Sequence, residues 1–78
     1  MADKNQTLNE VTEDKIVKGN KSIPTGQHLT VKLAENSTFV VKSGAKLTIG
    51  ESRNNRVFYE ANAEVKLGKQ TGTLLQEV

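Results

Sequence analysis

The chain has 78 residues, a formal net charge of +2 and no cysteine. The absence of cysteine excludes a disulfide framework and a thiolate metal site, and the nearly balanced charge argues against a nucleic-acid partner. A chain of this length is expected to form one domain. No apolar run is long enough for a secretion signal or a membrane span, so we expect a protein that is made in a reducing cytoplasm and is not associated with a membrane.

Residues 1–19 are polar, and the aliphatic side chains larger than alanine in this segment are Leu8, Val11, Ile16 and Val17. We expect an N-terminal arm that is partly disordered on its own, because chain termini are often loosely held. Two roles are open for it: a solvated tail, or a docking peptide that uses these four aliphatic residues. Ile16 and Val17 are expected to pack on the first turn of the domain that follows, which we place at residues 20–78.

One ten-residue phrase occurs three times at 18-residue intervals, in residues 23–32, 41–50 and 59–68. Aligning the copies gives columns that are apolar throughout: Ile23/Val41/Tyr59, Leu29/Leu47/Val65 and Val31/Ile49/Leu67. Polar residues alternate with these columns, which is typical of a strand with one buried face. The same interval continues outside the phrase in one more apolar column: Phe39/Val57/Leu75.

The repeat predicts an all-β fold, a short β-solenoid (parallel β-helix) of about three 18-residue turns stacked about 4.8 Å apart. Turn residues also share columns, as expected for bends with positive φ: Gly26/Gly44/Asn62, Asn36/Asn54/Gly72 and Gly50/Gly68. The stacking would place Lys42 beside Glu60 and Lys46 beside Glu64, which pairs opposite charges. The alternative fold is a small antiparallel meander with hairpin tips at residues 35–36 and 54–55.

Val40 and Phe58 share a column that alternates with the inward positions, so we expect both side chains to face outward. A domain this small is marginally stable without disulfides, metal or partners. An exposed aliphatic and aromatic pair is typical of a subunit contact, and we predict a homo-oligomer, a symmetric trimer, around this face. The alternative is that the strand twists there and that Phe58 belongs to the core.

No group of residues is arranged for catalysis. His28 is the only histidine and occupies an outward column, where an exposed structural role is the expectation and a three-histidine zinc site is excluded. The carboxylates Glu51, Glu60 and Glu64 fall on different sides or turns of the predicted coil, so no pair is placed for acid–base chemistry. We therefore predict no catalytic residue, no cofactor, no metal site and no enzymatic activity.

Residues 41–50 (VKSGAKLTIG) resemble the turns of parallel β-helix and β-solenoid proteins, and the resemblance covers about residues 20–73. That group includes phage tail spikes, head fibres and decoration proteins and, more distantly, the bactofilin filaments. The resemblance concerns architecture, and this chain has fewer turns and more polar corners than a bactofilin core. The long solenoid enzymes that cleave polysaccharide carry clustered acids that this chain lacks, so no activity is carried over.

The resemblance, the small core and the lack of a reactive cluster lead to one main hypothesis. The chain is expected to be a structural assembly protein, such as a phage capsid decoration (cement) protein or a part of a tail spike or fibre, located in the virion. Its solenoid face would mediate self-association, and its arm would attach it to the larger particle. Two alternatives stay open: a bactofilin-like cytoskeletal filament subunit, and a small module or inhibitor that binds a protein or glycan through one face, for instance a basic corner.

Overall fold

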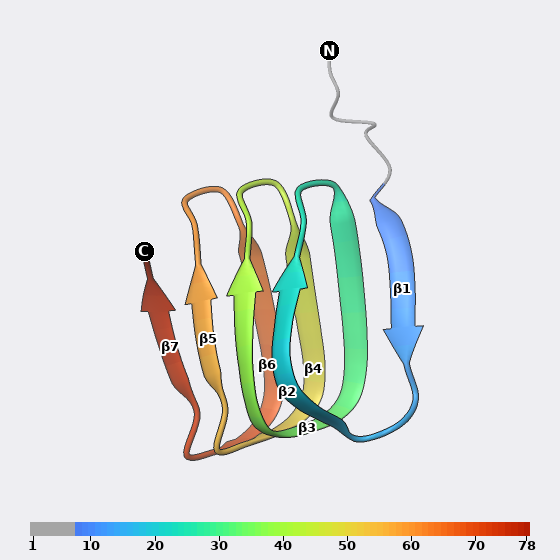
Figure 1. The fold of residues 1–78 in the computed structure, drawn as a ribbon, viewed down its shortest axis with the longest axis vertical. Coiled ribbons are helices and arrows are strands. Elements are labelled where there is room, and N and C mark those ends of the chain that lie inside the picture. Colours follow the sequence, from blue (N-terminus) through green and yellow to red (C-terminus); the bar gives the residue numbers. More distant parts are fainter. Residues whose placement is uncertain (1–7) are drawn as a thin grey trace.

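The computed structural model describes residues 8–78, in which every paired strand runs parallel to its partner (Figure 1). In chain order the strands are β1 (Asn9–Glu13), β2 (Val17–Ile23), β3 (Gln27–Val41), β4 (Lys46–Arg53), β5 (Arg56–Tyr59), β6 (Glu64–Thr71) and β7 (Leu74–Glu77). The described residues contain no helix with the length and apolar character needed to cross a membrane.

The strands form a β-solenoid of about four turns. One side, here called the β4 side, stacks β1, the first part of β3, β4 and β6. The opposite side, called the β5 side, stacks β2, the second part of β3, β5 and β7. β3 belongs to both sides because it continues through a bend at Asn36, and Figure 1 shows the turns following one another from β1 to β7.

The register confirms the predicted 18-residue stacking. On the β4 side, Leu29 pairs with Leu47, and Leu47 pairs with Val65. On the β5 side, Phe39 lies beside Val57. Since all these pairs are parallel, the antiparallel meander is wrong.

The coil contains one more turn than the repeated phrase suggested. β1 pairs with β3 and places Val11 beside Leu29, so stacking begins by Asn9, ahead of the boundary set at residue 20. The phrase is hard to recognise here because Val11 is the only aliphatic side chain that β1 adds to a core column. Glu13 occupies the column of Val31, where the later turns are apolar.

The core lies between the two sides and is most complete in the middle turns. Leu47, Ile49 and Val57 are fully buried there. Their equivalents in the last turn are less covered: Leu67 is half-buried and Leu75 is 46% exposed. Burial in this fold therefore depends on a neighbouring turn above and below.

Two of the three turn columns adopt the predicted backbone conformation. Positive φ occurs in one column at Gly26, Gly44 and Asn62, and in the other at Asn36, Asn54 and Gly72. Each column is a bend repeated once per turn. Glycine and asparagine occupy them because both residues tolerate the left-handed region.

For the third column, Gly50 and Gly68, the prediction of a bend with positive φ is wrong. A Cβ on Gly50 would lie 2.9 Å from the carbonyl oxygen of Lys32, and a Cβ on Gly68 would meet the carbonyl oxygen of Gly50. Glycine is needed here because the backbones of successive turns approach closely.

Candidate functional site

The column predicted to face outward lies on the outer surface of the β5 side. Ser22 pairs with Val40, Val40 with Phe58, and Phe58 with Gln76. Val40 and Phe58 are half-buried, while their sequence neighbours Phe39, Val41 and Val57 are fully buried. The strand does not twist Phe58 into the core, and its ring stands beside Val40 on the surface.

Two further apolar side chains extend this surface. Leu74 pairs with Arg56 in the outward column next to Phe58 and is 48% exposed. Val78 continues the same alternation, receives no cover from a later turn among the described residues, and is 67% exposed. We call Val40, Phe58, Leu74 and Val78 the outer apolar patch. Leu74 and Val78 are not among the residues predicted from the sequence to form an interface. Their spacing of two residues from Gln76, which shares the outward column of Phe58, indicates that both face outward.

The opposite outer surface, on the β4 side, has a shallow groove of about 400 Å³. Side chains of three strands and two glycines line it: His28, Lys46, Thr48, Lys66, Gly50 and Gly68. The two glycines lack side chains for the steric reason given above, and this leaves the hollow open. Lys46 is paired with Glu64, with 3.7 Å between its Nζ and Oε2 of the carboxylate.

His28 in this groove joins three strands. Its Nδ1 is 2.8 Å from Oε1 of Glu10 on β1, and its Nε2 is 2.9 Å from Oγ1 of Thr48 on β4. The side chain is 16% exposed, so it is more buried than the outward column predicted. Through these two contacts His28 holds β1 on the coil. The described residues contain no cluster of three metal-ligating side chains.

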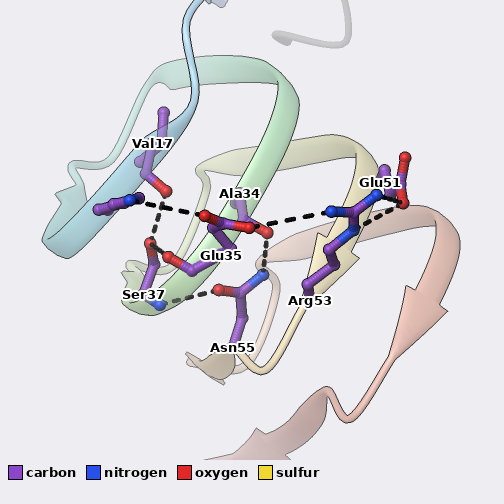
Figure 2. Close-up of polar contacts among 8 residues, drawn as sticks. Val17, Ala34, Glu35, Ser37, Glu51, Arg53 and Asn55 are labelled. Atoms are coloured by element: carbon purple, nitrogen blue, oxygen red, sulfur yellow. Dashed lines mark hydrogen bonds and ion pairs between the residues drawn. The ribbon is translucent and has the colours of Figure 1, made fainter.

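A buried polar network occupies the bend below the core (Figure 2). The Asn55 side chain is 1% exposed, accepts a hydrogen bond from the Ser37 backbone N–H at 2.8 Å and donates to the Ala34 carbonyl oxygen at 2.9 Å. It also donates to the hydroxyl of Ser52 at 2.7 Å. Ser37 in turn donates to the Val17 carbonyl oxygen at 2.9 Å. The network satisfies backbone groups of successive turns, which is what buried polar groups require.

Charged side chains run along the same corner. Glu35 pairs with both Lys18 and Arg53: Nζ of Lys18 is 3.6 Å from one carboxylate oxygen, and an Arg53 nitrogen is 3.9 Å from the other. Figure 2 shows Arg53 reaching toward Glu35 and Glu51. Arg53 also bonds Glu51, with 2.7 Å between a terminal guanidinium nitrogen and Oε2. Arg53 is therefore paired with two carboxylates at this corner.

The four aliphatic residues predicted for arm docking have different positions. Val17 is 5% exposed and belongs to the core, and Val11 packs against that core from β1. Leu8, the first described residue, is half-buried. Ile16 is 53% exposed, so the expectation that it packs on the first turn is wrong, and it is the member of the set that is available to a partner.

The carboxylates do not gather into a catalytic pair among the described residues. Glu64 pairs with Lys46 and Glu51 pairs with Arg53. Glu60 lies on the other side, where the Ser43 backbone N–H donates to its carboxylate at 2.8 Å and Lys42 lies 3.5 Å away. That hydrogen bond, followed by the charge of Lys42, lowers the pKa of Glu60 below its ordinary value.

Comparisons of the chain with protein-family models, with curated proteins and with solved structures found no match. A functional assignment therefore has to come from the surfaces described above.

Proposed function

We propose that this chain is a non-enzymatic structural assembly protein that self-associates through the outer apolar patch. The observation that carries the proposal is the position of Val40 and Phe58, which stand side by side on a regular, rigid strand surface. Leu74 and Val78 enlarge the apolar area to three adjacent strands. Exposed apolar surface of this kind is typical of subunit contacts.

A symmetric trimer is the proposed oligomer, with the patches of three copies meeting around one axis. The resemblance to phage decoration, spike and fibre proteins suggests a virion as the setting, with the solenoid attached to a capsid or tail. Ile16 is the proposed contact to that larger particle, because Val11 and Val17 are engaged within the coil.

The proposal is tested by the mass of the purified protein in solution. Light scattering coupled to size exclusion is expected to give an oligomer at micromolar concentration, and Phe58→Glu is expected to remove the patch contact. Thr12→Glu places a new charge on an exposed residue of β1, on the β4 side, and is expected to change nothing. A wild-type monomer, or an equal effect of both substitutions, contradicts the proposal.

The groove on the β4 side supports a second candidate, a module that binds a glycan or another polar ligand. Lys66 reaches this groove and has no ion-pair partner among the residues that the structure describes. Thr48 supplies a hydroxyl beside it. A glycan array tests this function: a defined ligand that loses affinity with both Lys66→Ala and Thr48→Ala supports it, whereas Phe58→Glu should leave binding intact.

A further inference from the structure

The two ends of the coil differ in what they offer to another strand. Within residues 8–78, β1 and β2 have only β3 as a neighbour, and β6 and β7 have only β4 and β5. Among these residues, each end therefore has backbone groups without a strand partner, and such groups are templates for pairing with another chain. What distinguishes the ends is the set of side chains beside those groups.

At the N-terminal end, charged residues occupy core columns. Glu13 stands in the column of Val31 and Lys21 stands in the column of Phe39. Inward-pointing charges are a common protection of a sheet edge against pairing. Glu10 within β1 and Asp14 directly after it add further negative charge.

At the C-terminal end, the same columns hold leucines. Leu67 continues the column of Val31 and is half-buried, and Leu75 continues the column of Phe39 and is 46% exposed. Val65, also half-buried, lies in the remaining column of the β4 side. The apolar core therefore reaches the surface at this end.

From these two ends we propose that two copies of the chain pair end to end through their C-terminal edges, β6 and β7, in a closed, two-fold symmetric contact. This contact is separate from the outer apolar patch and does not rest on the function proposed above. The partner surface is a second copy because the charges of β6 are complementary to themselves.

That complementarity follows from an antiparallel pairing of β6 with its symmetry mate. If Val65 lies opposite Val65 of the second copy, then Glu64 lies opposite Lys66 of the second copy, and the pair occurs twice. Glu64 and Lys66 are both exposed in one copy, so both are accessible to such a partner. The inward side chains of the two edges then face a shared core.

The other two ways to join the ends are unfavourable. Head-to-tail stacking in the 18-residue register would place Glu64 beside Glu10, Leu67 beside Glu13 and, on the other side, Leu75 beside Lys21. It would set like charges together and bury two charged groups against leucines. Joining two N-terminal ends would bring the acidic residues of both β1 strands together. The charges thus favour a closed dimer over a polar filament.

A charge-exchange experiment tests this contact. It is carried out in the Phe58→Glu background, so that association through the outer apolar patch does not contribute. Glu64→Lys alone and Lys66→Glu alone each place like charges opposite one another twice. Each is expected to raise the dimer dissociation constant by about tenfold or more, measured by analytical ultracentrifugation. An equimolar mixture of the two variants restores opposite charges at both positions and is expected to form the dimer again.

Two controls make the outcome decisive. Thr12→Lys changes the N-terminal edge; it leaves an end-to-end dimer intact but weakens a head-to-tail contact, in which residue 12 would lie beside Lys66. Circular dichroism verifies that each variant keeps its β structure. A Phe58→Glu protein that is monomeric throughout, a mixture that stays monomeric, or a dimer lost in Thr12→Lys overturns the proposal. The outer apolar patch is tested separately, by comparing the mass of the wild-type protein with that of Phe58→Glu, so either proposal can fail while the other stands.

Discussion

The middle turn and the last turn of this coil are built from the same columns of residues, but they differ in how well those residues are covered. Val57 is fully buried between Phe39 and Leu75, whereas no later turn within residues 8–78 covers Leu75, which is 46% exposed. Leu47 and Val65 differ in the same way on the β4 side. The comparison shows that the burial of a side chain in a solenoid, and so its contribution to stability, depends more on the turns above and below it than on its own turn.

The largest expected effect comes from emptying matched core positions in the two turns. Leu47→Ala should lower the free energy of unfolding by about 2–5 kcal/mol, because it leaves a cavity between two turns. Val65→Ala, in the same column of the last turn, should cost about 1 kcal/mol in a protein that is monomeric. Urea unfolding measures both, and equal losses would mean that burial along the stack does not set stability.

A smaller difference in the free energy of unfolding is expected between Asn55 and Thr73, which share the polar column at the bend. Asn55→Ala should cost about 1–3 kcal/mol, because it leaves the Ser37 N–H and the Ala34 carbonyl without their buried partner. Thr73→Ala in the last turn removes one half-buried hydroxyl bonded to Ser52 at 2.7 Å and should cost less. Thermal unfolding of the two variants tests the order, and a larger loss for Thr73→Ala would reverse it.

Substitutions at the bends should cost the same in the middle and last turns, because the loss of stability there comes from the backbone conformation of the substituted residue itself. Asn54 and Asn62, in the middle and last turns, have φ of 54° and 67°. Replacing either by alanine should cost about 1 kcal/mol, and the two losses should be equal within error. Glycine at either position should be tolerated. Chemical unfolding of the four variants measures this, and a loss confined to Asn54→Ala would show that stacking also governs the bends.

The smallest effect is a dependence on pH at Glu60, which connects the second and third copies of the repeated phrase. Because the pKa of Glu60 is lowered in the folded state, its stabilising effect is present above the unfolded pKa of about 4.3. That effect is lost as pH falls through the folded pKa. Glu60→Gln should therefore weaken the dependence of the unfolding midpoint on pH below this value. An unchanged slope between pH 5 and 3 would show that the Ser43 hydrogen bond does not favour the ionised form.

Much of the fold could be predicted from the sequence because the repeat is regular where the core is regular. The columns of Leu29, Phe39 and Ile23 predict the stacking, and Gly26 and Asn36 predict the bends, since each column recurs at one interval. The outward position of Val40 and Phe58 follows from alternation alone. Their role as an interface stays a prediction.

The parts that could not be predicted are those where the repeat changes its residues. β1 was missed because Glu13 stands where the other turns are apolar. The Asn55 network could not be predicted because its column contains Gly19, Ser37, Asn55 and Thr73, four different residues of which three have polar side chains. The need for glycine at position 50 could not be predicted, because it depends on the distance between the backbones of successive turns, and the sequence alone does not give that distance.

The 18-residue stacking is tested most directly by a designed crosslink, because the chain has no cysteine of its own. Thr30 and Thr48 are half-buried partners on adjacent parallel strands, whose Cα atoms lie about 4.8 Å apart and within the range for a disulfide. The Thr30→Cys/Thr48→Cys protein should form an intramolecular disulfide on oxidation in nearly all molecules, seen as a loss of free thiol by mass spectrometry. A double variant that keeps both thiols free in the folded state would contradict the stack.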